Sequence, residues 1–228
     1  MRYTTLLFDL DHTLFDFDAS EIAAFNATLA RAGVESPNGH AEIFTDINLA
    51  LWADVERGVL TPNEVRTLRF EQLIDRTGID ADPRVMADDY VHGLGANGDL
   101  YPGARSVLDE LSPQAALALI SNGIGEVQRA RIARLGLERY FEAIVISGEV
   151  GTAKPGTGIF DIVFEHLGSP ARAAALMIGD SLSSDIAGGI NYGIDTCWYA
   201  PGATPDTSAR ATYQITSLDQ IPPIVRGN

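Results

Sequence analysis

Short apolar runs that alternate with helical stretches set the strongest limit on what this chain can fold into. The runs are rich in Val, Ile and Leu and lack strict polar alternation, which is typical of strands buried on both faces of a parallel sheet. They are Thr4–Leu10, Ala116–Ile120, Ala143–Ile146, Ala174–Ile178 and Thr196–Tyr199. The stretches with helical spacing are Ala104–Leu111, Glu126–Leu135, Gly158–Leu167 and Ser183–Tyr192. This alternation predicts an α/β fold with a doubly wound parallel sheet and right-handed crossovers.

The region after the first apolar run breaks this alternation. From about Phe17 to Gly98 the spacing is helical and no convincing strand occurs. Ser20–Arg31 carries apolar residues at helical spacing, and Thr61-Pro62 with Glu64 forms a capping-box start for another helix. A helical block of this length is too long for a simple crossover. We therefore expect an inserted all-α cap domain over residues 17–98, and a core built from residues 1–16 and 99–228.

The charge balance limits the partners of the protein. With 16 Lys and Arg against 31 Asp and Glu, the formal net charge is −15, which argues against binding a nucleic-acid polymer. The single cysteine, Cys197, excludes an internal disulfide and indicates no oxidising compartment. The first residues, interrupted by acids at Asp9 and Asp11, resemble neither a signal peptide nor a membrane span. We expect a cytoplasmic protein without a membrane partner, which needs a local positive charge if it processes anions.

Asp9 and Asp11 stand at the end of the first predicted strand, where ligands bind in open α/β sheets. Residues two apart in an extended segment point the same way, so both carboxylates can face one site. Such a pair repels unless one acid is protonated or a cation lies between them. It can then supply a nucleophile that also binds metal and a neighbouring proton donor. Taken alone, the pair is equally compatible with two solvated acids.

Three further segments follow later predicted strands. Ser121-Asn122-Gly123 offers a hydroxyl and backbone N–H groups to a phosphoryl oxygen, although alone it is a common turn. Lys154 can balance carboxylate and phosphate charge, although alone it is typical of a surface lysine. Asp180 is placed to bind a hard cation, and Asp185 can either orient that cation's ligands or merely stabilise a helix start. Together with Asp9 and Asp11 these segments supply the groups that phosphoryl transfer requires.

The order of these segments resembles a known family. The sequences DLDHT at 9–13, SNG at 121–123, AKP at 153–155 and GDSLSSD at 179–185 are similar to the four motifs of the haloacid dehalogenase-like phosphatases. The resemblance covers the whole core, and the insertion point matches the helical type of cap in that family. It implies a Rossmann-like core and a Mg²⁺-dependent phosphomonoester hydrolase that works through an aspartyl-phosphate.

Carried over position by position, the resemblance also implies roles. Asp9 would be the nucleophile, and Asp11 the general acid and base whose backbone carbonyl binds the metal. Lys154 would steady the phosphoryl charge. The catalytic set is thus Asp9, Asp11 and Lys154; the magnesium set is Asp9, Asp11, Asp180 and Asp185; the substrate-binding set is Thr13, Ser121, Asn122 and Trp52.

Trp52 belongs to a cap stretch, residues 48–58, that looks like the cap of the family's pyrimidine 5′-nucleotidases, as do the core segments 145–151 and 188–191. Trp52 could stack on a base, and an arginine of the cap could reach a phosphate or sugar. A tryptophan among apolar helical residues is more often part of a core, and cap arginines are usually solvated. The arginines in question are Arg57, Arg66 and Arg69. The resemblance implies a nucleoside 5′-monophosphate as substrate, and we expect a monomer or weak homodimer.

Other functions remain open on the sequence. A phosphatase of phosphoglycolate or a sugar phosphate and, less favoured, a phosphomutase use the same groups. A dehalogenase is disfavoured, because displacing halide requires neither a proton donor at Asp11 nor a metal-binding Asp180. A phosphoacceptor signalling domain similar to a receiver would not explain the helical insertion. His12 has no second histidine spaced for zinc, which indicates a positional role, and Cys197 is expected to be an inert core thiol.

Overall fold

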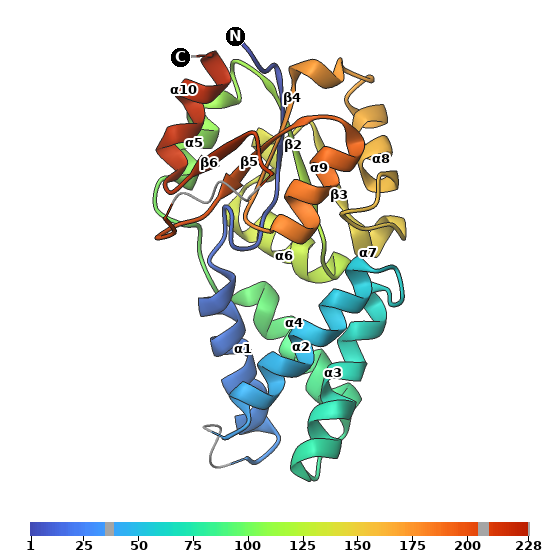
Figure 1. Ribbon diagram of the computed structural model, residues 1–228. Helices are drawn as coiled ribbons and strands as arrows, with labels where there is room; N and C mark the ends of the chain where they lie inside the picture. Colours follow the sequence, from blue (N-terminus) through green and yellow to red (C-terminus); the bar gives the residue numbers. More distant parts are fainter. Residues whose placement is uncertain (35–38, 205–209, 228) are drawn as a thin grey trace.

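The computed structural model describes residues 1–34, 39–204 and 210–227, and Figure 1 shows a helix-covered sheet beside a separate group of helices. The strands are β1 (Thr5–Phe8), β2 (Ala116–Ser121), β3 (Ala143–Ile146), β4 (Ala175–Gly179), β5 (Asp195–Tyr199) and β6 (Tyr213–Ile215). All neighbouring strands pair in parallel, in the order β3-β2-β1-β4-β5-β6. The predicted α/β class with a parallel sheet is confirmed.

Alternating side chains explain why both faces of the sheet are covered. The helices of this body are α5 (Ala104–Leu111), α6 (Gly125–Leu135), α7 (Ser147–Val150), α8 (Gly158–His166), α9 (Ala187–Tyr192) and α10 (Ile221–Arg226). Leu6 and Phe8 of β1 are buried in a cluster with residues of α5, α6 and α10. Leu7 is buried in a second cluster with residues of α8 and α9. Because successive strand residues point to opposite faces, a strand covered on both faces is apolar throughout.

The second body consists of α1 (Phe17–Arg31), α2 (Ala41–Glu56), α3 (Pro62–Thr77) and α4 (Pro83–Ala96). It has its own hydrophobic core, in which Phe44 contacts the rings of Phe25, Phe70 and Tyr90 at centroid separations of 4.3, 5.3 and 5.2 Å. The predicted helical insertion is therefore confirmed. Its limits at residues 17 and 98 stay a prediction.

The start of α3 follows the predicted capping box. The Glu64 N–H donates to the Thr61 hydroxyl (3.3 Å), and the Thr61 N–H donates to the Glu64 carboxylate (2.7 Å). Asn63, in the same turn, donates its side-chain amide to the Gly148 carbonyl of the core (3.3 Å). The sequence that starts this helix therefore also sets a contact between cap and core.

Two chain segments connect the bodies and run side by side. The Asp16 N–H at the start of α1 donates to the Asp99 carbonyl (2.9 Å). Gly98 has a φ of 83°, and a Cβ there would lie 2.5 Å from the ring of Phe15. Only glycine accommodates that conformation and that close contact. The chain therefore passes from core to cap and returns to the core at the same place.

Parts of the carboxyl-terminal half differ from the predicted pattern. β6 and α10 follow the last predicted strand, where no element was expected. The predicted helix Ser183–Tyr192 is a π-helical turn, Leu182–Ile186, followed by α9. Within the described residues, no helix combines the length and the apolar character that crossing a bilayer requires.

Candidate active site

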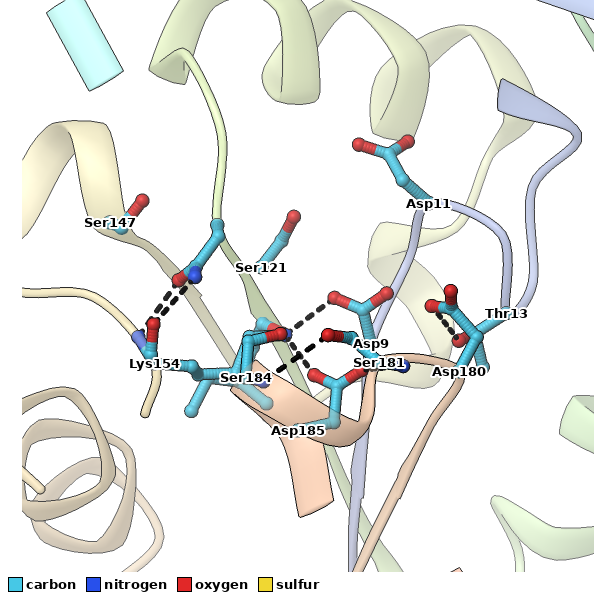
Figure 2. A network of polar contacts seen from close by, with 12 residues as sticks. Asp9, Asp11, Thr13, Ser121, Ser147, Lys154, Asp180, Ser181, Ser184 and Asp185 are labelled. Atoms are coloured by element: carbon cyan, nitrogen blue, oxygen red, sulfur yellow. Dashed lines mark hydrogen bonds and ion pairs between the residues drawn. The ribbon is translucent and has the colours of Figure 1, made fainter. Parts of the chain in front are cut away.

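The carboxyl ends of three adjacent strands bring the predicted site residues together. Asp9 directly follows β1, Ser121 ends β2 and Asp180 follows β4. β1 lies between β2 and β4, and all three are parallel, so these ends lie at the same edge of the sheet. Lys154 comes from the loop before α8. Figure 2 shows how these side chains, drawn from distant parts of the chain, gather at that edge.

Lys154, the only lysine of the chain, is buried between two carboxylates. Its Nζ donates to Asp9 Oδ1 (2.6 Å), to Asp185 Oδ1 (2.6 Å) and to the Ile120 carbonyl (2.8 Å) (Figure 2). Three acceptors match the three N–H groups of an ammonium. Burial alone would lower the pKa of Lys154, but the charges of Asp185 and Asp9 outweigh burial and raise it. The side chain is therefore a fixed cation.

Asp9, Asp180 and Asp185 form a compact group of acids. One carboxylate oxygen from each lies within 4.8 Å of the other two. Burial raises the pKa of Asp9, and repulsion by Asp185 and Asp180 raises it further, while Lys154 acts in the opposite direction. Burial, followed by repulsion from Asp185, raises the pKa of Asp180 to about 6. Buried acids that repel one another and offer only oxygen ligands fit a hard divalent cation such as Mg²⁺.

Local backbone structure fixes Asp185 in this group. The residue lies in the π-helical turn, and its Oδ2 accepts a hydrogen bond from the Ser181 N–H (3.0 Å). A Cβ on Gly179 would lie 2.2 Å from the same oxygen. The glycine of the Gly-Asp pair therefore leaves the room that the Asp185 carboxylate occupies.

Two neighbours hold Asp180 from either side. Thr13, which is fully buried, donates its hydroxyl to Asp180 Oδ1 (3.3 Å). Trp198 on β5 donates its indole N–H to the backbone carbonyl of Asp180 (2.7 Å). The structure thus places Thr13, a predicted substrate ligand, against an acid of the group. Trp198 was not predicted, because an indole in an apolar run gives no sign of which carbonyl it will meet.

Asn122 ties the end of β2 to the loop that carries Lys154. Its amide nitrogen donates to the Lys154 carbonyl (2.8 Å), and its amide oxygen accepts from the Lys154 N–H (2.9 Å). Ser121 is buried beside it, and its hydroxyl accepts from Gln128 Nε2 (3.1 Å). The two predicted phosphoryl ligands therefore lie next to the buried lysine.

The carboxylate of Asp11 turns away from the group of acids (Figure 2). Its Oδ1 accepts from Arg131 Nη1 (2.7 Å) and its Oδ2 from Gln128 Nε2 (2.7 Å), both on α6. Asp9 and Asp11 line one cavity, as expected, but their carboxylates do not point the same way. β1 ends at Phe8 and His12 has a φ of 61°, so the two-residue period of a strand no longer applies at Asp11.

Gln128 and Arg131 contact Asp11 and were not predicted from the sequence. Both are buried, and they share the buried face of α6 with Val127 and Ile132. Polar residues on the apolar face of a helix that directly follows a strand-end motif indicate contacts to that motif, because buried polar groups need hydrogen-bond partners.

The cap closes the site through α2. Trp52 and Glu56 line a cavity of about 250 Å³ together with Asp9 and Lys154. Glu56 also accepts a hydrogen bond from the Ser183 hydroxyl of the core (3.2 Å). Trp52 therefore lies beside the acids, as a residue that contacts substrate would.

The three cap arginines differ in their surroundings. Arg57 pairs with Asp54, and Arg66 pairs with Asp88 (2.7 Å) and Glu126. Arg69 lines a second, smaller cavity with Trp52 and Asp11. Among these three, Arg69 is therefore the candidate for contact with a substrate.

Cys197 fits its predicted role. It is fully buried in the cluster under β5, and burial raises the pKa of its thiol to about 12. A protonated, inaccessible thiol is unreactive.

Comparison with known proteins identifies the family. A family model described as haloacid dehalogenase-like hydrolase matches residues 6–199. The chain belongs to this family. It is 36% identical to the pyrimidine 5′-nucleotidase PynA of Streptococcus pneumoniae, over 97% of this chain and 94% of PynA. It is 34% identical to the pyrimidine 5′-nucleotidase YjjG of Escherichia coli, over 97% of each chain.

A solved structure also matches this haloacid dehalogenase-like hydrolase over nearly its full length. YfnB of Bacillus subtilis, in a crystal form bound to magnesium, is 34% identical, with a TM-score of 0.89 and coverage of 99% of both chains. The fold, the family and the group of acids together identify the chain as a phosphatase of the haloacid dehalogenase-like type.

Proposed function

We propose that this phosphatase uses Mg²⁺ and hydrolyses pyrimidine nucleoside 5′-monophosphates through a phosphoaspartate formed on Asp9. The observation that carries the proposal is the bridge from Lys154 to Asp9 and Asp185 beside Asp180. It joins a buried carboxylate, a fixed cation and a set of oxygen ligands in one cavity. The full-length similarity to two pyrimidine 5′-nucleotidases supports the choice of leaving group.

In the first step, a carboxylate oxygen of Asp9 attacks phosphorus as the bond to the ester oxygen breaks. Lys154, held by Asp185, places a positive charge beside the attacking carboxylate and the phosphoryl oxygens. The carboxylates of Asp9, Asp180 and Asp185 and the backbone carbonyl of Asp11 would hold Mg²⁺, which would neutralise charge on the same oxygens. Ser121 and the Asn122 N–H contact the phosphoryl group.

Asp11 serves both proton transfers. It donates a proton to the leaving ester oxygen, and then takes one from the water that hydrolyses the phosphoaspartate. Its hydrogen bonds to Arg131 and Gln128 support a positioning role for these two residues.

The cap selects the leaving group. Trp52 offers a ring next to the cavity that holds the acids, where a nucleoside bonded to the phosphoryl group would extend. For Thr13, the hydrogen bond to Asp180 supports positioning of a metal ligand in place of substrate contact. The cytoplasmic location and the monomeric or weakly dimeric state remain predictions from the sequence.

A substrate panel in the presence of Mg²⁺ tests the proposed specificity. Thymidine 5′-monophosphate (dTMP), dUMP and UMP should show kcat/KM values about 10-fold or more above those of ribose 5-phosphate and phosphoglycolate. Ribose 5-phosphate is the matched control, because it keeps the ester and the sugar and lacks only the base. If the nucleotides rank no higher than these controls, the nucleotidase assignment fails while the phosphatase assignment stands.

A further inference from the structure

Glu56 ends α2 at the place where the cap reaches the candidate active site. It lines the cavity of about 250 Å³ that Asp9 and Lys154 also line, and it lines a neighbouring cavity of about 470 Å³ between cap and core. A leaving group bonded to phosphorus in the first cavity would extend past Glu56 into the second. Glu56 is therefore a cap residue that can act on the leaving group.

The Glu56 carboxylate contacts the core with one of its oxygens. Its Oε1 accepts a hydrogen bond from the Ser183 hydroxyl (3.2 Å), and Ser183 lies in the π-helical turn whose Ser184 and Asp185 line the same cavity. The side chain is half-buried, and its Oε2 is accessible and has no hydrogen-bond partner among the described residues. The contact with Ser183 thus holds the carboxylate at the edge of the cavity with one oxygen open to a ligand.

The charge of Glu56 differs from that of the other acids around this cavity. Two of those acids pair with Lys154, Asp11 pairs with Arg131, and Asp180 belongs to the group of acids that fits a divalent cation. Glu56 forms no ion pair with any residue that the structure describes. The lining therefore carries one negative charge that no cation offsets.

The position of Glu56 is unfavourable for a negative charge. It is the last residue of α2, where the helix dipole disfavours an anion. The adjacent cation, Arg57, pairs with Asp54, and the acids of the cavity repel a further carboxylate. A charge that lowers stability in this way is typical of a residue that serves function.

We propose that Glu56 selects substrates with an uncharged leaving group, because its carboxylate repels a second anionic group on the substrate. A cavity of about 250 Å³ is only about 8 Å across if it is spherical, so a charge on the leaving group lies close to Glu56. Like charges at about this separation in a partly buried site repel enough to change kcat/KM about 10-fold or more. The phosphoryl group meets Lys154, whereas a second anion would meet Glu56.

Two aryl phosphates of matched shape test this selection. 4-Carbamoylphenyl phosphate and 4-carboxyphenyl phosphate differ in an uncharged amide against a carboxylate of nearly the same size. The ratio of kcat/KM for the amide to that for the carboxylate should fall about 10-fold or more from the wild type to Glu56→Gln. Glutamine keeps the acceptor for Ser183 and removes only the charge. An unchanged ratio overturns the proposal, and so does an equal change on both substrates, which would assign Glu56 to cap contact alone.

Two control variants separate the charge from its surroundings. Ser183→Ala removes the hydrogen bond between cap and core and keeps the carboxylate, so it should keep the wild-type ratio. Asp46→Asn removes an exposed acid of α2 that lines neither cavity, and it should also keep the ratio. A fall in Ser183→Ala as large as that in Glu56→Gln would assign the effect to the cap contact. An equal fall in Asp46→Asn would assign it to net charge, and either result overturns the proposal.

This inference rests on the proposed site of phosphoryl transfer and not on the identity of the nucleoside. A wild-type enzyme that prefers no nucleotide to ribose 5-phosphate leaves the selection by Glu56 intact, because ribose is also an uncharged leaving group. An unchanged ratio in Glu56→Gln overturns the selection and leaves the nucleotidase proposal intact. The two proposals are therefore tested separately.

Discussion

Lys154 shows at the scale of one residue why the site tolerates buried charge. Its side chain is 1% exposed and pairs with carboxylates that follow two different strands, Asp9 after β1 and Asp185 after β4. Removing one partner from a buried ion pair lowers the free energy of unfolding by more than the intact pair adds to it, because the remaining charge is then buried and unpaired. The lysine thus stabilises the group of acids, and in the proposed mechanism it also supplies charge for phosphoryl transfer.

Replacement of this lysine should affect stability and activity together. Lys154→Met should lower the free energy of unfolding by about 3–5 kcal/mol in Mg²⁺-free buffer at neutral pH, and kcat by about 10²- to 10³-fold. Added Mg²⁺ should recover part of the stability, since the cation replaces the lost positive charge. Urea unfolding and steady-state kinetics measure both effects.

The matched control for Lys154→Met is Arg226→Met, which removes an exposed cation paired with Glu110. It should change stability by less than about 1 kcal/mol and leave kcat as in the wild type. Wild-type kcat in Lys154→Met would exclude the lysine from the chemistry.

The sequence predicted where the main residues of the site lie, but not all of their contacts. Asp9, Lys154 and Asp180 were predicted to meet because the carboxyl ends of neighbouring parallel strands share one sheet edge. The contacts of Asp11 and Thr13 were not predictable, because both follow the end of β1, where strand periodicity no longer holds. Side-chain direction in such a loop depends on partners that come from other elements.

At the scale of elements, α6 is the part of the core that contacts both Asp11, the proposed proton donor, and the cap. Arg131 is fully buried and joins Asp11 to the Leu94 carbonyl of α4 (2.9 Å) and to the Ser20 hydroxyl of α1 (3.3 Å). Its guanidinium also lies 4.5 Å from the ring centroid of Phe15. The position of the acid is therefore coupled to the place where the cap joins the core.

This coupling predicts a dependence on the leaving group for the Arg131→Met variant. Loss of the Asp11 contact should reduce kcat/KM for dTMP at least about 10-fold more than for p-nitrophenyl phosphate, because a good leaving group needs little proton donation. Steady-state kinetics with both substrates give the ratio of kcat/KM for dTMP to that for p-nitrophenyl phosphate.

Arg134→Met is the matched control for Arg131→Met. Arg134 lies on the same helix and bonds the carbonyls of Gly95 (3.3 Å), Asn97 (3.0 Å) and Gly98 (2.7 Å), with no contact to Asp11. The Arg134→Met variant disturbs the same interface between core and cap but leaves the Asp11 contact intact. Its ratio of kcat/KM for the two substrates should therefore equal that of the wild type. An equal loss on both substrates in Arg131→Met would assign Arg131 to structure alone.

The elements themselves differ in how far the sequence determines them. α5 has the predicted bounds, Ala104–Leu111, because its apolar spacing is regular and its ends are clear. The π-helical turn at Leu182–Ile186 was predicted as ordinary helix, since its extra residue per turn depends on the contacts of Asp185 and not on propensity. β6 has only three residues and, within the described part of the chain, pairs only with β5, so local pattern gave too little signal.

At the scale of the whole molecule, the group of acids links stability to pH and to metal. The pKa of Asp180 is raised from 3.8 to about 6 in the folded protein without metal. The folded protein therefore holds a proton that the unfolded chain releases. The stabilisation from this proton is complete below about pH 4 and is lost as pH rises through about 6. Above that pH the ionised acids repel one another, and Mg²⁺ should relieve the repulsion.

The increase in melting temperature on adding Mg²⁺ should accordingly be larger at about pH 7.5 than at about pH 5, where protons compete with the metal. Asp180→Asn should raise the melting temperature of the metal-free protein at about pH 7.5 and abolish most of the Mg²⁺ effect. Asp75→Asn, an exposed acid on α3, should leave the Mg²⁺ effect unchanged. Thermal unfolding at both pH values provides the comparison, and a Mg²⁺ effect that is independent of pH and of Asp180 would contradict this linkage.

The most direct measurement for the whole account is the detection of the phosphorylated residue. The Asp11→Asn variant, in which hydrolysis of the intermediate lacks its base, is mixed with Mg²⁺ and p-nitrophenyl phosphate, whose leaving group needs little proton donation. The mixture is quenched in acid and reduced with borohydride, which converts an acyl phosphate to homoserine. Mass spectrometry of the peptides should locate homoserine at position 9 and nowhere else. Homoserine at another acid, or unmodified Asp9 while p-nitrophenol is released in a burst, would contradict the assignment of Asp9 as the nucleophile.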